Sequence, residues 1–219
     1  IHKEIDENQL KKIVKEFTGT ISQLPPVRSS VKRQVRQRKV YYFELLEIEE
    51  KDALFRVGCE AGTYIRKLIS DLGKKLGTGA HMAELRRTKA GPFNESTLVT
   101  LQELADAYHY WKEEQKEKLI RQAIQPVENA VAHLPKIWVA DSAVDTLCHG
   151  ASLNVPGISK FEAGIEKGDR VAVMSLKGEL VGYGLSSNTS EIFRKQNKGL
   201  AVKVEKVFML PGTYPKMQK

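Results

Sequence analysis

Glycines recur every few residues in the last third of the chain, and this spacing constrains the fold more than any other feature. They separate short apolar runs and stand at Gly157, Gly164, Gly168, Gly178, Gly182, Gly184 and Gly199. Short strands joined by glycine turns are typical of small β barrels. The sequence therefore predicts a mostly β domain here, beginning with a strand at Ile137-Trp138-Val139 and a short helix that Gly150 ends.

The pattern before His133-Leu134-Pro135 is different, so we place a domain boundary there. Apolar residues at helical spacing predict one helix after Asp6 that Gly19 ends, and another over 65–76 that Gly77 ends. The remaining elements expected in this part are an antiparallel hairpin over 40–48 and 53–60, a short strand over 81–88, a helix that Thr100 and Glu103 begin with a capping box, and helical turns over 119–131 broken at Pro126.

The expected fold class is therefore α+β. It comprises a mixed-sheet domain over residues 1–134, a small β-barrel domain over 135–212 and a C-terminal tail over 213–219.

Positive charge is spread over both parts of the chain. There are 23 basic and 19 acidic residues up to Leu134 and 12 and 8 beyond it, so each part carries +4 of the net +8. This favours a polyanionic partner, although ordinary surface solubility gives the same excess. No apolar run is long enough to span a bilayer and no secretory signal pattern is present, so we expect a cytoplasmic protein with no membrane partner.

Two motifs carry the chemistry of the first part: Gly62-Thr63-Tyr64-Ile65-Arg66, and further along Glu84-Leu85-Arg86-Arg87-Thr88. An aromatic ring such as Tyr64 can stack on a base that has left its own stack. An arginine in the first turn of a helix is unfavourable for the helix dipole, so we expect a carboxylate partner for Arg66. Alternatively, Tyr64 merely packs at a helix start and Arg66 is a surface arginine.

These motifs resemble the C-terminal active-site motifs of the TruB/dyskerin pseudouridine synthases, and the resemblance extends over nearly the whole chain. It implies that Tyr64 stacks on a flipped uracil, that Arg66 pairs with the catalytic aspartate, and that Leu85 forms an apolar floor beneath the base. The cations beyond Leu85 are then expected to contact phosphates, with a solvated strand edge as the alternative: Arg86, Arg87 and Lys89.

A run of cations precedes the predicted hairpin. Residues 28–39 hold six basic and no acidic residues, which favours a basic loop. The resemblance aligns residues 20–39 with the family's thumb loop, which closes over substrate RNA; a solvated linker is the alternative. The side chains expected to bind substrate RNA are Arg28, Lys32, Arg33, Arg36 and Arg38.

The glycine-rich part resembles a PUA RNA-binding domain in the order Cys148-His149-Gly150-Ala151, Pro156-Gly157-Ile158, Lys167-Gly168-Asp169-Arg170-Val171 and Gly182-Tyr183-Gly184. Residues 203–208 are similar to its closing strand. PUA domains bind RNA ends and stems through shape and backbone contacts. In dyskerin-type enzymes this module holds the ACA end of a guide RNA, which implies guide-RNA contacts at His149, Gly150, Lys160, Lys167 and Arg170.

The nearest resemblance is to the archaeal H/ACA dyskerin-type enzyme. It implies conversion of uridine to pseudouridine in rRNA, and also in tRNA, by the catalytic subunit of a guide-RNA ribonucleoprotein. The implied partners are guide RNA, substrate RNA, a small zinc-ribbon-type H/ACA protein, a glycine/arginine-rich-type H/ACA protein and a kink-turn-binding ribosomal-type protein. We expect no organic cofactor and no metal, since Cys59 and Cys148 are far apart and the histidines are scattered.

One family motif has no counterpart among the 219 residues. It is the Gly-Thr-Leu-Asp-Pro segment, whose aspartate acts as nucleophile or base, and Asp71, Asp141 and Asp169 lack its surroundings. We expect that segment to lie upstream of Ile1, and this chain to be inactive by itself. The alternatives are a catalytically inactive RNA-binding scaffold made of a truncated synthase and a PUA module, and a ribosome-associated PUA protein with an unrelated first domain.

Overall fold

The computed structural model describes residues 1–26 and 31–216, in two compact units, Ile1–Arg86 and Arg87–Lys219. The elements of the first unit are α1 (Glu7–Lys15), β1 (Gly19–Gln23), β2 (Arg36–Glu49), β3 (Asp52–Cys59) and α2 (Ile65–Leu76). The second unit begins with β4 (Lys89–Ala90), β5 (Phe93–Asn94), η1 (Glu95–Thr97), α3 (Leu101–Glu114), α4 (Glu117–Ala123) and η2 (Val127–Val131). It continues with β6 (Lys136–Val139), α5 (Asp141–Cys148), β7 (Leu153–Asn154), η3 (Val155–Gly157), β8 (Ile158–Phe161), β9 (Arg170–Met174), β10 (Leu180–Ser186), α6 (Ser190–Lys195) and β11 (Leu200–Val207).

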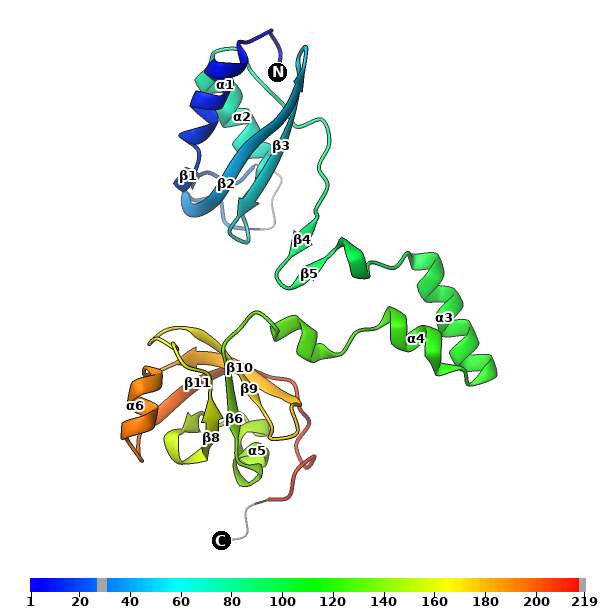
Figure 1. The fold of residues 1–219 in the computed structure, drawn as a ribbon, viewed down its shortest axis with the longest axis vertical. Helices are drawn as coiled ribbons and strands as arrows, with labels where there is room; N and C mark the ends of the chain where they lie inside the picture. Colours follow the sequence, from blue (N-terminus) through cyan, green and yellow to red (C-terminus); the bar gives the residue numbers. More distant parts are fainter. Residues whose placement is uncertain (27–30, 217–219) are drawn as a thin grey trace. The chain divides into compact units, whose positions relative to one another are not determined.

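The first unit is a three-stranded antiparallel sheet, in the order β1-β2-β3, with α1 and α2 packed on one face (Figure 1). The two helices and the sheet share one apolar core, in which Leu10, Phe43 and Leu72 are buried. Along β3, Phe55 and Val57 lie against this core while Leu54 is exposed, as expected from alternation in a strand with one covered face. The predicted hairpin is confirmed.

The helix α2 ends where the sequence predicts. Gly77 is its C-cap, with φ 71° in the left-handed region, and its N–H donates to the carbonyl oxygen of Lys74. Glycine adopts this conformation without a steric penalty. By contrast, α1 ends at Lys15, before Gly19, because Phe17 and Thr18 bond back to the last turn; Gly19, at φ 99°, begins β1 instead.

The prediction of a loop over residues 20–39 is wrong at both ends. Gly19–Gln23 pairs with Arg36–Val40, which places Ile21 opposite Arg38. Backbone bonds make this ladder, and the long stems of arginine and lysine lie on a sheet as readily as in a loop, so charge alone did not reveal the strands. Only residues 24–35 join β1 to β2, and Arg28 lies outside the described residues.

The strand predicted over residues 81–88 is also wrong. This stretch is irregular, and its side chains from Ala83 to Thr88 are exposed. The strand β4 begins only at Lys89, which pairs with Asn94 in a two-residue ladder. A basic run without alternating apolar residues has no face to bury, and burial is what stabilises most strands.

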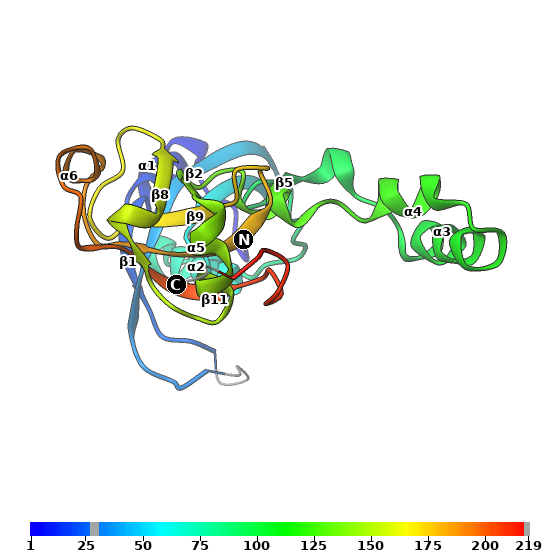
Figure 2. The same cartoon turned by 90° about the horizontal axis from the view of Figure 1, so that it is seen from below.

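Helices α3 and α4 form an antiparallel hairpin in which the two lie side by side (Figure 2). Thr100 and Glu103 form the predicted capping box: the Thr100 hydroxyl accepts from the Glu103 N–H at 3.1 Å, and the Glu103 carboxylate accepts from the Thr100 N–H at 2.6 Å. These bonds satisfy backbone donors that the first turn leaves unpaired. The predicted break at Pro126 separates α4 from η2.

The rest of the second unit is a six-stranded, nearly closed, barrel-like sheet in the order β7-β11-β10-β9-β6-β8. Its pairs are antiparallel except β6 with β9, which run parallel. Gly182 and Gly184 of β10 face β11 so closely that a Cβ would lie 2.4 Å from the Lys206 oxygen and 2.2 Å from the Lys203 oxygen. The regular spacing of glycines thus reflects the close approach of neighbouring strands as well as turns. The predicted α+β class with a small β barrel is confirmed.

Tyr214, in the segment predicted as a tail, belongs to the barrel core and is 5% exposed. Its hydroxyl donates to the Glu179 carboxylate at 2.5 Å. Just before it, the Gly212 N–H donates to the carboxylate of Asp145, which is buried in α5. Residues up to Tyr214 therefore belong to the folded domain.

Candidate functional site

Tyr64 lies where the chain turns from β3 into α2. Gly62 has φ 82°, and both the N–H and the hydroxyl of Thr63 donate to the Glu60 carbonyl oxygen, which fixes the turn. Tyr64 is the N-cap residue of α2, with φ −89° and ψ 101°, and its side chain makes no capping bond. Its side chain is half-buried, so the ring is partly accessible at a rigid junction.

The backbone of Tyr64 is held by a residue from another strand. Gln23, the last residue of β1, is 3% exposed. Its Oε1 accepts from the Tyr64 N–H at 3.0 Å, and its Nε2 donates to the Tyr64 carbonyl oxygen at 3.2 Å. The carboxamide thus satisfies its own donor and acceptor while fixing both peptide groups of Tyr64.

Arg66 is exposed in the first turn of α2, and that turn holds no acidic residue. Within the residues that the structure describes, Arg66 takes part in no ion pair. Its neighbour Lys67 pairs with Asp71 one turn further along the helix. A guanidinium in this position is open to a carboxylate or phosphate and is opposed by the positive end of the helix dipole.

Leu85 is 55% exposed, in the irregular segment that follows α2. No hydrogen bond or ion pair joins Tyr64, Arg66 and Leu85 across the described part of the chain. Their grouping around one base, with Leu85 as an apolar floor, stays a prediction. The cations after Leu85 are all exposed, as a phosphate-contact role requires: Arg86, Arg87 and Lys89.

The basic residues predicted in the thumb loop fall into two groups. Lys32 and Arg33 are exposed ahead of β2, whereas Arg36 and Arg38 lie within β2 and are half-buried. Arg38 donates to the Gln37 carbonyl oxygen at 2.9 Å and lies 3.9 Å from the Glu60 carboxylate. Its guanidinium also packs over Gly62, where a Cβ would lie 3.3 Å from Nε.

This packing makes Arg38 a brace for the turn that leads to Tyr64. The Nε atoms of Arg36 and Arg38 are buried, and neither has a hydrogen-bond partner among the described residues. Arg36 is half-buried in β2, and its contact with a phosphate stays a prediction. Arg38 is tied to its own neighbours instead.

Three of the five residues predicted to contact guide RNA have partners within the barrel domain. His149 caps α5, with Nδ1 2.8 Å from the Asp145 carbonyl oxygen. Lys160 Nζ lies 4.1 Å from the centre of the Trp138 ring. Arg170 pairs with Glu205 at 3.1 Å. All five residues are exposed, including the other two, Gly150 and Lys167.

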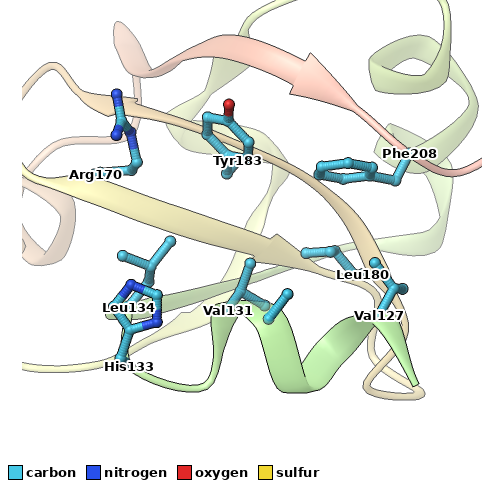
Figure 3. Close-up of a pocket in the computed structure, with 9 residues that line it drawn as sticks. Val127, Val131, His133, Leu134, Arg170, Leu180, Tyr183 and Phe208 are labelled. Carbon is cyan, nitrogen blue, oxygen red and sulfur yellow. The ribbon is translucent and has the colours of Figure 1, made fainter. Parts of the chain in front are cut away.

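A cavity of about 410 Å³ lies between η2, strands β9 and β10, and Phe208, which follows β11 (Figure 3). Its wall is mainly apolar and includes Val131 from η2 and Leu180 from β10. The rings of Tyr183 and Phe208 stand 5.9 Å apart along it, and the Arg170 guanidinium lies 5.4 Å from the Tyr183 ring centre. No sequence pattern pointed to this cavity, because its lining residues come from segments far apart in the chain.

Family models match successive parts of the chain. A model of the N-terminal domain of TruB family pseudouridylate synthases matches residues 1–65, a model of the tRNA pseudouridylate synthase B C-terminal domain matches 66–132, and a PUA domain model matches 135–208. A protein of Pyrococcus horikoshii described as a probable tRNA pseudouridine synthase B is 58% identical over 218 residues. The chain belongs to the TruB family of pseudouridylate synthases.

Solved structures extend this similarity to three dimensions. The chain matches a protein in a Cbf5-Nop10-Gar1 complex with a TM-score of 0.90 and 56% identity, over 99% of this chain and 66% of that one. It matches a protein in an H/ACA RNP bound to a substrate RNA containing 2'-deoxyuridine with a TM-score of 0.85 and 53% identity, over 99% and 65%. Against the Pyrococcus relative, the alignment covers 99% of this chain and 65% of the relative's length.

The TruB-family resemblance pointed to Tyr64 but not to Gln23. A single glutamine before Leu-Pro-Pro carries no signal of burial, and only the fold brings it next to a residue 41 positions away. Among residues 1–26 and 31–216, no group of three or more His, Cys, Asp or Glu side chains is placed to hold a metal ion. No helix in the same ranges is long and apolar enough to cross a membrane.

Proposed function

We propose that this TruB-family chain is part of an RNA pseudouridine synthase, the catalytic subunit of an archaeal H/ACA guide-RNA ribonucleoprotein that acts on rRNA and also on tRNA. The observation that carries the proposal is similarity over 99% of the chain to a protein found in an H/ACA RNP with substrate RNA. The partly accessible ring of Tyr64, on a backbone held at both peptide groups, supports it.

In this proposal Tyr64 stacks on the uracil that has left its RNA stack. A ring that is already held in position suits this role, because stacking on it then offsets the free energy that is lost when the base leaves its own stack. The exposed Arg66 grips the catalytic aspartate by two parallel bonds, which only a guanidinium can form. Leu85 covers the base from below, and Arg36, Arg86, Arg87 and Lys89 contact phosphates. The aspartate detaches the uracil, which turns and rejoins the sugar through carbon.

The residues of this chain are proposed to be inactive alone. None of the aspartates among the 219 residues lies in a Gly-Thr-Leu-Asp-Pro motif. In this proposal the chain supplies the residues that hold the base, and turnover requires the aspartate motif in addition. No organic cofactor enters the proposed reaction.

The partners proposed are a guide RNA, a substrate RNA and two small proteins corresponding to Nop10 and Gar1 of the similar complex. A kink-turn-binding protein and a cytoplasmic location complete the proposal. Guide RNA is proposed to contact the PUA domain at Gly150 and Lys167, which are exposed, and at His149, Lys160 and Arg170 after rearrangement of their present contacts.

The test is a uridine-isomerisation assay on the enzyme that includes the aspartate motif, assembled with guide RNA and the two small proteins. Pseudouridine at the guided position is the expected product, and a guide with a scrambled targeting sequence serves as the control. RNA binding without any isomerisation would favour the inactive scaffold. The 219-residue chain, assayed alone, should give no product.

A further inference from the structure

Gln23 bonds to the backbone of Tyr64, the N-cap residue of α2, from outside the helix. Serine, threonine, aspartate and asparagine are preferred at the N-cap because their side chains accept a bond from the helix. The Tyr64 side chain makes no such bond, and Gln23 bonds to the N–H and carbonyl oxygen of Tyr64 itself, accepting from that N–H as the N3 side chain does in a capping box. The ring of Tyr64 takes no part in these bonds, while its backbone is held.

The strand β1 does not need this contact to stay in place. Five residue pairs join Gly19–Gln23 to Arg36–Val40, and Ile21 packs against the core of the first unit. The Gln23 side chain reaches away from this ladder to a residue at the start of α2. With both peptide groups of Tyr64 held, the ring retains only its two side-chain torsions.

We propose that Gln23 is a positioning residue that sets the Tyr64 ring in place for stacking on the target base. This inference rests on the proposed function, since it assigns a catalytic contact to Tyr64. Catalysis that depends on orientation is sensitive to small displacements, and a shift of about 1 Å can cost on the order of 100-fold in rate. Gln23 acts through Tyr64 and touches no substrate.

The geometry is tested first in the 219-residue chain by amide hydrogen exchange and NMR. The Tyr64 N–H of the wild type should exchange slowly, with a nuclear Overhauser contact to the Gln23 carboxamide protons. Gln23→Met removes both bonds with little change in side-chain length, and should speed exchange at Tyr64 by at least about tenfold. The Leu72 amide, in the middle of α2, should be unaffected. Fast exchange of the wild-type Tyr64 amide would overturn the proposal.

The positioning role is tested by a double-mutant cycle in the whole enzyme with guide RNA. Gln23→Met should lower kcat by about 10- to 100-fold, with KM within about twofold of the wild type, because phosphate contacts dominate RNA binding. In a Tyr64→Ala background the same change should have less than about a twofold effect, because the ring it positions is gone. An equal loss in both backgrounds would show a general structural role and contradict the proposal.

Gln37→Met is the matched control: Gln37 is exposed on β2, opposite Ser22, and the variant should keep wild-type kcat and KM. If Gln23→Met does not fold, Gln23→Asn replaces it, since it keeps a neutral carboxamide that is one methylene too short to make both bonds to Tyr64, and a loss of kcat in the same direction is expected. Failure of both to fold would overturn the positioning role. A wild-type enzyme without isomerase activity would refute the proposed function and leave the NMR result standing.

Discussion

At the scale of single residues, the cations of the first unit divide into those that pack against the protein and those that are exposed. Arg38 is tied to Gln37 and Glu60 and packs over Gly62. Lys32, Arg33 and Arg66 are exposed. A neutralised phosphate releases counterions only where the cation can reach RNA, so the exposed group should govern the salt dependence of binding.

Changing Lys32 and Arg33 together to alanine should weaken RNA binding and flatten its dependence on salt. The slope of log affinity against log salt should fall by up to about 0.7–0.9 for each phosphate that is no longer neutralised. Titrations at several salt concentrations measure it, with Lys12 and Lys74 changed to alanine as a control of equal charge. An unchanged slope would make this segment a solvated linker.

Replacing Arg66 with lysine should cripple turnover in the whole enzyme. An ammonium cannot form the two parallel bonds to a carboxylate, so kcat should fall by at least about tenfold, while RNA affinity changes little. Single-turnover kinetics and equilibrium binding separate the two effects, and Lys74→Arg on the same helix is the control. Full turnover by the lysine variant would remove Arg66 from the proposed site.

At the scale of elements, α2 carries the candidate site at its start and a left-handed glycine at its end. An alanine at Gly77 meets no neighbouring atom within 4 Å, so its cost is conformational only. Gly77→Ala should therefore lower the free energy of unfolding by about 1–2 kcal/mol. Urea denaturation checks this, with Lys74→Ala as the control. A loss below a few tenths of a kcal/mol would contradict the left-handed cap.

The elements that could be predicted from sequence are those with periodic apolar residues. Helix α2, the β2–β3 hairpin and the glycine-rich barrel strands all have such a pattern. The pairing of β1 with β2 could not be predicted, because cations occupy the strand at Arg36 and Arg38 and the ladder is made by the backbone. For the site, the motif pointed to Tyr64 and Arg66, whereas Gln23 is joined to Tyr64 only by tertiary folding.

At the scale of the whole molecule, the chain combines TruB-family domains with a PUA domain whose core includes Tyr214. Residues 135–216, which include Tyr214, should fold cooperatively alone and bind an ACA-ended RNA stem better than one with a scrambled end. Thermal unfolding and competition binding test both statements. Equal affinity for the two stems would show that the domain contributes only nonspecific electrostatic attraction to RNA binding.

The bond between Tyr214 and Glu179 should give this domain a defined pH range of stability. Hydrogen bonds from Tyr214 and Ser175 lower the pKa of Glu179. The ionised carboxylate therefore stabilises the domain at pH values above its ordinary pKa of 4.5, and this stabilisation is lost as pH falls through the lowered pKa. The same bond raises the pKa of Tyr214, so that effect is present below 10.0 and is lost as pH rises through the raised pKa.

Tyr214→Phe should therefore lower the melting temperature at neutral pH. Its difference from the wild type should shrink at both the acid and the alkaline end. Scanning calorimetry across pH measures this, with Tyr183→Phe as the control. A difference independent of pH would show that packing, and not the hydroxyl bond, is responsible.

The position of β6 inside its sheet has a consequence for synthesis. It is the first strand of the barrel to leave the ribosome, yet its parallel neighbour β9 begins only at Arg170. Until then its Ile-Trp-Val run has only the short antiparallel strand β8 as a partner, and the apolar edge toward β9 stays open. Pairing between strands distant in sequence is slow, and unpaired edges favour aggregation. A ribosome that stalls before residue 170 therefore carries a partly folded, aggregation-prone domain. Growth temperature and elongation rate should for this reason affect the yield of folded protein more than the stability of the finished fold suggests.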